Sequence, residues 1–271
     1  SEGARRIIVG LGGSSTNDAG AGLLAALGAG PAEALARGGA ALADATVADL
    51  GGLSEVRARF AGIDLVIASD VDSPLLGFKG TSAVHSPHNG AAPGVAQQLE
   101  AALGQFTETV GHAFSGSGRT TDPFGVDLLT GKPRRPEKEP GAGAGGGLGY
   151  ALILLGGRRV SGVGAVLSAV GFGDAVAHHD LVVTGEGCLD WQSLSGKVVS
   201  GVAAAALAAA TPSIVIAGQV MVGRRETMGL GVSGCYAVAE TLDQIEAAMT
   251  DPVGTLRARA ARVATTWSPR R

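Results

Sequence analysis

Carboxylates, hydroxyls and one lysine are concentrated between Asp180 and Lys197, directly after a short apolar segment. The apolar residues Leu181, Val182 and Val183 predict a strand that is buried on both faces. In open parallel sheets, ligands bind beside the carboxyl ends of the strands, where the loop after this strand would lie. Carboxylates and a lysine on such a loop can hold a phosphate with its metal ion and can move a proton. The loop therefore predicts phosphate chemistry.

Side-chain chemistry assigns a catalytic role to three residues of this loop. Asp190 is the candidate base for a hydroxyl group, and Lys197 is a candidate phosphate contact. Glu186 is a candidate for binding Mg²⁺ or a substrate hydroxyl. The further residues of the loop that we expect to bind substrate or phosphate are Gly185, Gly187 and Gln192.

The Gly-Lys pair that ends this loop is not part of a Walker A motif. That motif requires a glycine five residues before the Gly-Lys pair and Ser or Thr after it, but Trp191 and Val198 occupy those positions. Acidic and small polar residues are also ordinary in loops that join a strand to a helix. The alternative to phosphate chemistry is therefore a loop with a structural role only.

A second polar loop follows the strand predicted for residues 5–11 and precedes the helix predicted for residues 19–28. A strand, a loop rich in Gly and Ser, and a helix start can together bind an anion through backbone N–H groups. The dinucleotide fingerprint is excluded, because Ser15 stands where its third glycine is required. Capping of the helix is the structural alternative. The residues expected to bind a phosphate or a carboxylate are Ser14, Ser15, Thr16, Asn17 and Asp18.

Two aspartates follow the strand predicted for residues 63–68. Asp70 and Asp72 would point in opposite directions from an extended chain, but a turn before Pro74 allows both to reach one cation. Carboxylate oxygens suit Mg²⁺, so both are candidate metal ligands, with substrate hydroxyls as the other candidate partners. Ordinary turn chemistry is the structural alternative.

A glycine-rich stretch covers residues 141–149 and leads into a helix whose apolar face includes Leu148, Leu152 and Leu155. Glycines allow the backbone to come very close either to a ligand or to a neighbouring segment. With a phosphate-bearing ligand, Gly143 and Gly145 would contribute backbone contacts. Tight packing of the helix against a sheet is an equally good explanation.

Composition limits the class of protein. The chain has 271 residues, 45% of them hydrophobic and 17% charged, which is typical of a folded globular protein. Its net charge of −3, without a long basic run, gives no indication of nucleic-acid or membrane binding. No segment approaches about 18 consecutive apolar residues, the length that spans a membrane. The widely separated Cys188 and Cys235 predict free thiols and a cytoplasmic location.

Strands and helices alternate in the second half of the chain, which predicts a parallel sheet with helices on both faces. The expected strands are residues 181–184, 213–217 and 235–238; the expected helices are residues 198–210, 224–229, 241–250 and 252–267. Asp251 and Pro252 predict the N-cap and the first position of the last of these helices. Its buried stripe would consist of Val253, Leu256, Ala260, Val263 and Trp267. An amphipathic pattern also predicts a helix over residues 95–114. The turn at Gly171 and the change of pattern predict a domain boundary near residues 172–178, which separates residues 1–175 from 176–271.

Four of these stretches together resemble the type I glycerate kinase family. The matching segments are residues 9–22, 68–77, 140–149 and 184–197, which occur in the family's order and span most of the chain. The resemblance implies a fold of two α/β domains, one flavodoxin-like and one inserted into it. Residues 1–175 would be the inserted domain, and residues 176–271 would be the C-terminal half of the flavodoxin-like domain. We expect the polar loops to meet in a cleft between the two domains.

The resemblance also implies phosphorylation of D-glycerate by ATP and Mg²⁺, to 2-phosphoglycerate or 3-phosphoglycerate. A homo-oligomer is one candidate state of the protein, which the sequence does not decide. The alternatives are a non-catalytic member of the same ancestry and a kinase for another small hydroxy acid. The second alternative is suggested by His85, His88 and Asn89, where the family has a lysine-containing segment. Cys188 likewise replaces a family arginine, and each lost cation would weaken the binding of an anion.

The chain begins inside the family's pattern, without the family's opening strand and its lysine-containing loop. We therefore expect the sheet built from residues 181–184, 213–217 and 235–238 to expose an edge and an apolar face in these 271 residues. On its own, such a chain would be poorly stable or paired through that edge, and would have little turnover.

Overall fold

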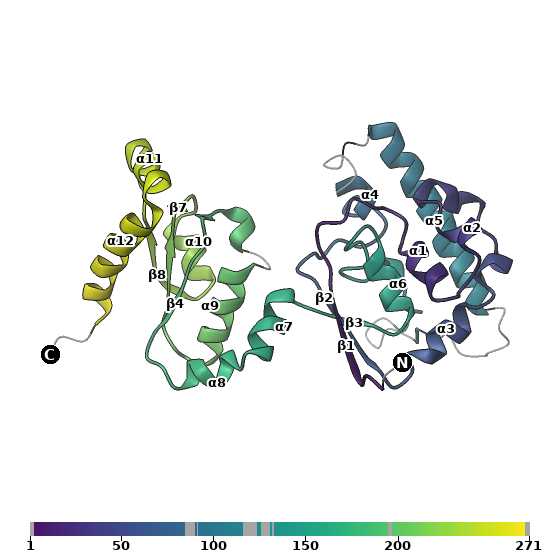
Figure 1. The fold of residues 1–271 in the computed structure, drawn as a ribbon, viewed down its shortest axis with the longest axis horizontal. Coiled ribbons are helices and arrows are strands. Elements are labelled where there is room, and N and C mark those ends of the chain that lie inside the picture. Colours follow the sequence, from purple (N-terminus) through teal and green to yellow (C-terminus); the bar gives the residue numbers. More distant parts are fainter. Residues whose placement is uncertain are drawn as a thin grey trace. The chain divides into compact units, whose positions relative to one another are not determined.

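The computed structural model describes residues 3–84, 90, 92–115, 124–125, 131, 133–194 and 197–268, without the side chains of Pro93 and Gln192. Backbone contacts divide the chain into two compact units, Ser1–Ser161 and Gly162–Arg271. The positions of the two units relative to one another are not determined, so each is described by itself (Figure 1).

The division falls before the region where the sequence predicts a boundary. The helices α7 (Gly162–Ala169) and α8 (Phe172–Ala177) belong to the second unit, because Val176 of α8 is buried with Val202 and Ala206 of the helix α9 (Val198–Ala208). The turn at Gly171, which precedes the predicted boundary at residues 172–178, therefore joins two helices of one unit, with a φ of 66°.

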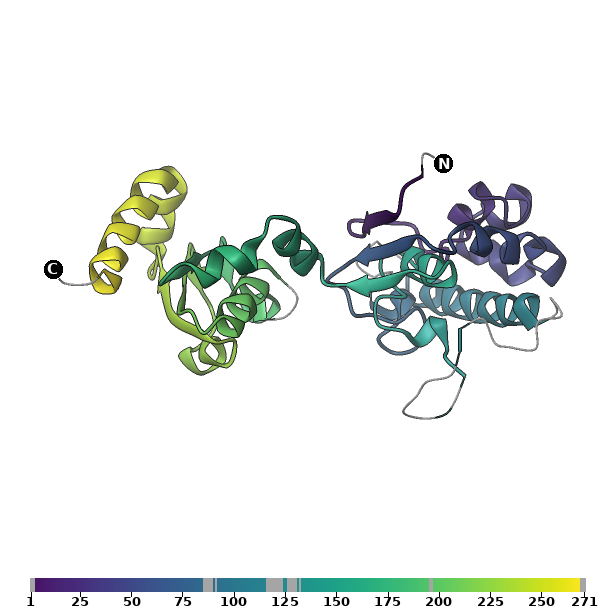
Figure 2. The same ribbon diagram turned by 90° about the horizontal axis from the view of Figure 1, so that it is seen from below.

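The first unit contains a three-stranded parallel sheet in the order β1 (Arg6–Gly10), β2 (Asp64–Ala68), β3 (Arg158–Val160). The strands β1 and β2 confirm the sequence expectations, whereas β3 was not predicted. Since β1 is an edge strand, it is paired on one side only (purple in Figure 2), and Ile8 in its middle is 56% exposed. Parallel strands place their carboxyl ends at one edge of a sheet, so the loops after these three strands begin close together.

Helices bury the core of this unit against the sheet. The long helix α5 (Pro93–Ser115) confirms the predicted amphipathic pattern, since Leu103, Phe106, Val110 and Phe114 of its apolar stripe are buried. The helix α6 (Leu148–Leu154) follows the glycine-rich stretch, as predicted, and buries Tyr150. The other helical segments are α1 (Ala21–Ala26), α2 (Ala32–Leu35), η1 (Gly39–Asp44), η2 (Val47–Leu50), α3 (Leu53–Arg59), α4 (Thr81–Val84) and η3 (Pro136–Lys138).

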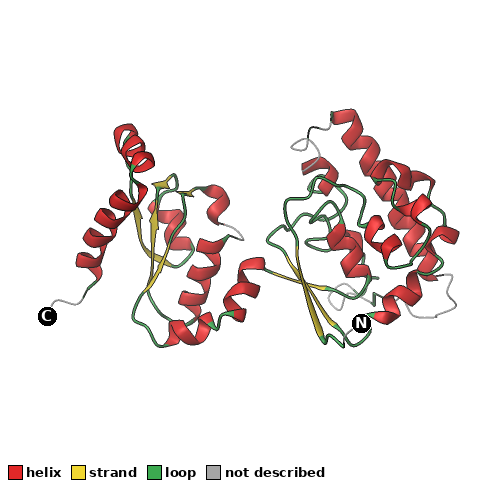
Figure 3. Cartoon of the chain, viewed as in Figure 1, coloured by secondary structure: helices red, strands yellow, loops and turns green. Residues whose placement is uncertain are grey.

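The second unit is built on a parallel sheet in the order β4 (Val182–Thr184), β6 (Ser213–Ala217), β8 (Val232–Ala237). The helix α9 packs on the face that carries Val215, and α12 (Pro252–Trp267) lies on the opposite face (Figure 3). The chain is therefore a mixed α/β protein with parallel sheets, as the sequence predicts. A short pair of strands, β5 (Cys188–Leu189) and β7 (Gln219–Val220), extends beyond this sheet; η4 (Trp191–Leu194), α10 (Arg224–Gly229) and α11 (Leu242–Thr250) complete the unit.

The start of α12 follows the predicted capping chemistry. The Asp251 carboxylate accepts a hydrogen bond from the Gly254 N–H at 2.9 Å, and Pro252 occupies the first turn. The apolar stripe predicted for this helix is only partly buried. Val263 is buried, but Val253 is 66% and Leu256 48% exposed. In the described residues, no helix is long and apolar enough to cross a membrane.

The exposed apolar residues continue onto α11, where Leu242 is 83% and Met249 80% exposed. We expect this surface to make the 271-residue chain associate with itself at micromolar concentrations. The double change Leu242→Lys with Met249→Lys should raise the monomer fraction in sedimentation velocity. Ala247→Lys, an exposed position on another side of the same helix, is the matched control and should leave the distribution unchanged. Equal effects of both variants would mean that charge alone, and not this surface, controls association.

Candidate functional site

Three of the predicted loops meet in the first unit. The loops after β1 and β2 are joined to the neighbouring strand at their first residues, because Leu11 N–H donates to the Ala68 carbonyl at 3.0 Å and Ser69 N–H to the Val160 carbonyl at 3.1 Å. The glycine-rich stretch joins both loops. The fourth predicted loop, residues 185–197, lies in the second unit, so the meeting of all four loops stays a prediction.

The glycine-rich stretch packs against the backbone of the two other loops. The Gly146 carbonyl accepts hydrogen bonds from the N–H groups of Asp18 and Ala19, both at 3.1 Å. A Cβ on Gly146 would lie 1.5 Å from the Thr16 carbonyl oxygen. Gly143 donates its N–H to the Ser73 carbonyl at 2.9 Å. These glycines therefore bring protein segments together, and the Gly143 N–H that we expected at a ligand already has a partner.

Two of the expected anion-binding residues of the first loop make contacts within the protein, and the other three are exposed. Asp18 caps α1, because its carboxylate accepts hydrogen bonds from the N–H groups of Gly20 at 2.9 Å and Gly22 at 3.2 Å. Asn17 donates to the buried Ser82 hydroxyl at 3.1 Å. The remaining members, Ser14, Ser15 and Thr16, are exposed, as Gly145 is in part, and are accessible to a ligand.

The two aspartates after β2 are tied to the end of β3. The Ser161 hydroxyl donates to Asp70 at 2.8 Å, and the Arg159 guanidinium forms an ion pair with Asp72 at 2.7 Å. Asp72 is accordingly neutralised in part by a cation. Among the described residues, no group of three or more His, Cys, Asp or Glu side chains is arranged to hold a metal ion. Arg159 and Ser161 were missed because β3 has too few apolar residues to be recognised as a strand.

In the second unit, the predicted polar loop runs along the end of β6. Gly185 follows β4 so closely to β6 that a Cβ would lie 2.2 Å from the Ile216 carbonyl oxygen. The carbonyl of Glu186 accepts the Gly218 N–H, and the carbonyl of Gly187 accepts the Gln219 N–H, both at 3.0 Å. Gly185 and Gly187 therefore fix the path of the loop, and they place Glu186 at the carboxyl edge of the sheet.

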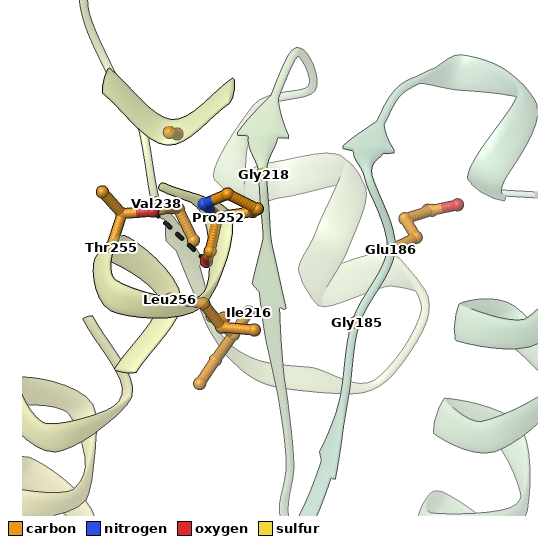
Figure 4. Close-up of a pocket in the computed structure, with 9 residues that line it drawn as sticks. Gly185, Glu186, Ile216, Gly218, Val238, Pro252, Thr255 and Leu256 are labelled. Carbon is orange, nitrogen blue, oxygen red and sulfur yellow. Dashed lines mark hydrogen bonds between the residues drawn. The ribbon is translucent and has the colours of Figure 1, made fainter. Parts of the chain in front are cut away.

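Glu186 carries a buried polar atom that the fold does not satisfy. Its Oε1 is inaccessible to solvent and has no hydrogen-bond partner among the described residues. Glu186 is one of the residues that line a cleft beside α12. In Figure 4 its side chain points away from Pro252 and Leu256, which line the same cleft. That cleft has a volume of about 330 Å³ and is lined mainly by apolar side chains. A buried carboxylate oxygen without a donor requires an explanation, and a cation or a substrate hydroxyl would supply one.

Asp190 stands at the start of η4 and has a capping role. Its Oδ1 accepts hydrogen bonds from the Ser193 N–H and hydroxyl, both at 3.1 Å, and Ser193 is fully buried. Asp190 as a whole is half-buried. Gln192 lies in η4, but its side chain is outside the described part of the chain, as are the residues 195–196 and the histidines 85 and 88.

Lys197 is the N-cap residue of α9, with its side chain exposed. The first N–H groups of an α-helix lack intrahelical acceptors, and a helix start with a nearby ammonium group suits a phosphate. The structure thus gives Lys197 a position that agrees with the predicted phosphate contact without testing it.

The two cysteines are free thiols, as predicted, and their surroundings differ. Cys188 is exposed in the polar loop, whereas partial burial raises the pKa of Cys235. Since the thiolate is the reactive form, we expect maleimide to modify Cys188 at least about 10-fold faster at pH 7.5. Mass spectrometry over time checks this, and Cys188→Ser should remove the fast phase. A fast phase that persists in Cys188→Ser would contradict the assignment.

Parallel sheets with polar loops at the carboxyl ends of their strands define the chain as an α/β protein of the kind that binds small ligands at a sheet edge. Comparison with known proteins identifies the family. The model of the glycerate kinase family matches residues 1–268. The chain therefore belongs to the glycerate kinase family.

Individual relatives agree with this membership. A glycerate kinase of Halalkalibacterium halodurans is 33% identical over 98% of this chain and 67% of its own length. Glycerate 2-kinase of Escherichia coli K12 is 33% identical over 91% of this chain and 60% of its own length. An uncharacterized protein of Mycobacterium bovis is 35% identical over 97% of this chain and 58% of its own length.

A solved structure from Salmonella typhimurium LT2, provisionally named glycerate kinase 2, superposes with a TM-score of 0.68 at 32% identity. The match covers 97% of this chain and 64% of that one. The chain thus spans roughly three-fifths of the length of the relatives that it matches, between 58% and 67% for those named above.

Proposed function

We propose that the protein transfers the terminal phosphoryl group of ATP to a hydroxyl of D-glycerate, giving 2-phosphoglycerate or 3-phosphoglycerate, with Mg²⁺ as the metal. Family membership and the names of two relatives support the substrate. The single structural observation that carries the proposal is Glu186, whose buried oxygen at the carboxyl edge of the second sheet has no donor among the described residues. This is the arrangement expected of a carboxylate that awaits a ligand.

The residues of the polar loop fit a phosphate and its metal. A carboxylate oxygen without a protein donor suits Mg²⁺, and we assign this role to Glu186. The exposed Lys197 and the N–H groups at the start of α9 suit the phosphates. When bound, Mg²⁺ would offset negative charge on the phosphates during transfer.

Side chains of the protein would accept the proton of the substrate hydroxyl and bind the carboxylate of D-glycerate. Asp190, held by its hydrogen bonds to Ser193, would accept the proton of the attacking hydroxyl. In the first unit, the exposed Ser14, Ser15 and Thr16 would donate hydrogen bonds to the glycerate carboxylate. A cytoplasmic location and a homo-oligomer stay predictions.

A coupled assay of ADP formation tests the proposal directly. The protein expressed from its complete gene, with ATP and Mg²⁺, should turn over D-glycerate at about 1–100 per second. Propionate, which has the carboxylate but neither hydroxyl of glycerate, is the control and should give no more ADP than water does. Equal ADP formation with and without D-glycerate would overturn the proposal. Turnover of another hydroxy acid, with none of D-glycerate, would show that the protein is a kinase with a different substrate.

A further inference from the structure

Arg159 lies at the junction of the three loops in the first unit. It occupies the middle of β3, in register with Ile67 of β2, and its side chain extends past the carboxyl end of β2. There its Nε donates to the Ser69 carbonyl at 3.1 Å, and its Nη2 pairs with the Asp72 carboxylate at 2.7 Å. One guanidinium therefore holds both the first residue and the middle of the loop after β2.

The glycine-rich stretch makes room for this side chain. A Cβ on Gly141 would lie 2.6 Å from the Arg159 Cδ and 3.1 Å from its Nε. The φ of Gly141 is +84°, which also disfavours any other residue there. The same stretch holds the far end of the loop, because Gly143 donates to the Ser73 carbonyl and leaves no space for a Cβ beside the Pro74 carbonyl. The loop is thus fixed from both ends.

The ion pair leaves Asp72 accessible. The side chain of Asp72 is 76% exposed, whereas that of Arg159 is 26% exposed. The guanidinium offsets the charge of Asp72, which lowers the attraction of this carboxylate for a divalent cation. It does not prevent the carboxylate from accepting a hydrogen bond from a neutral hydroxyl. This chemistry favours a hydroxyl of the acid substrate over Mg²⁺ as the partner of Asp72.

We propose that Arg159 is a positioning residue that holds Asp72 to accept a hydrogen bond from a substrate hydroxyl. This inference rests on the proposed function, because it names the class of substrate group that the loop after β2 recognises: a hydroxyl of a small hydroxy acid. Asp72 is then a substrate contact, and Arg159 acts through it.

Steady-state kinetics of the full-length protein test the proposal with four variants. Asp72→Asn and Arg159→Gln both remove the ion pair that holds residue 72, and the Asn amide is also a weaker acceptor than the carboxylate. Each should raise the KM for D-glycerate about 10-fold and change kcat little, because binding weakens in the ground state and the transition state alike. The double variant should be no worse than either single one, since the two residues act as a unit. Arg159→Lys should recover part of the loss, because it keeps the charge but not the two-point contact.

Arg158→Gln is the matched control. Arg158 is the neighbour of Arg159 in β3 and also pairs with an aspartate, Asp64, at 2.9 Å, but at the start of β2 and away from the loop. Its variant should keep the wild-type KM for D-glycerate. The concentration of Mg²⁺ that gives half-maximal rate should be unchanged in Asp72→Asn.

Two kinetic results would overturn the proposal. A rise in the Mg²⁺ requirement of Asp72→Asn, with an unchanged KM for D-glycerate, would make Asp72 a metal ligand. Additive effects in the double variant would mean that Arg159 does not act through Asp72.

Amide hydrogen exchange without any ligand separates this proposal from the proposed function. Exchange at residues 69–74 should rise in Arg159→Gln and not in Arg158→Gln, even if the protein proves to have another substrate; unchanged exchange there would also contradict the positioning role.

Discussion

Asp190→Asn is expected to lower kcat by about 10²–10⁴-fold, with little change in the affinity for D-glycerate. A general base removes a proton in the transition state and contributes little to binding in the ground state. The amide of Asn keeps an oxygen that can accept the hydrogen bonds of Ser193, so η4 should retain its cap while the basic group is lost.

Rapid-quench measurement of the first turnover gives the size of this effect, and isothermal titration gives the affinity. Asp251→Asn is the matched control, because Asp251 also caps a helix of the second unit through its carboxylate. It should leave kcat unchanged. If Asp190→Asn also keeps the wild-type rate, the role of base passes to another group, with Glu186 the first candidate.

Glu186→Gln is expected to lower kcat by about 10²-fold or more and to raise the concentration of Mg²⁺ needed for half-maximal rate. The change removes the charge of a carboxylate whose buried oxygen has no donor in the described part of the chain. Burying such an oxygen opposes folding, so its neutralisation should not lower the Tm. Loss of activity without loss of stability is the signature of a group retained for function.

Magnesium titrations of the rate and thermal unfolding of the ligand-free protein test both parts of this prediction. Glu246→Gln, on the exposed surface of α11, makes the same chemical change outside the polar loop and should leave both quantities unchanged. A marked fall in Tm for Glu186→Gln would show that the carboxylate stabilises the fold. If Glu186→Gln requires the same Mg²⁺ concentration as the wild type, Glu186 is not a ligand of the metal.

The sequence predicted those elements whose apolar pattern is unambiguous. The strand at residues 213–217 and the helix at 252–267 have the predicted bounds, because continuous β-branched residues and an Asp-Pro cap are strong local signals. The strand β3 escaped prediction, because Arg158 and Arg159 do not resemble a buried strand. Their charges are satisfied by Asp64, Asp72 and a backbone carbonyl, and these contacts depend on segments distant in sequence.

The candidate site, too, could be predicted from the sequence only in part, because its contacts depend on segments distant in sequence. The polar loop of residues 185–197 was recognised from its residue types, but only coordinates separate the capping contacts of Asp190 from the unsatisfied oxygen of Glu186. The glycine-rich stretch allowed two explanations from sequence. Its contacts with the Thr16 and Pro74 carbonyls show that close packing accounts for Gly143 and Gly146. Spacing along the chain contains no information on which distant backbone a glycine approaches.

The most direct test of the account is ³¹P NMR of the full-length protein with ATP, Mg²⁺ and D-glycerate. We expect a new phosphomonoester resonance that matches 2-phosphoglycerate or 3-phosphoglycerate and grows in step with ADP, because the proposed transfer moves one phosphoryl group to one hydroxyl. Release of inorganic phosphate with ADP, or unchanged ATP, without any phosphomonoester would contradict the assignment of glycerate phosphorylation to this protein.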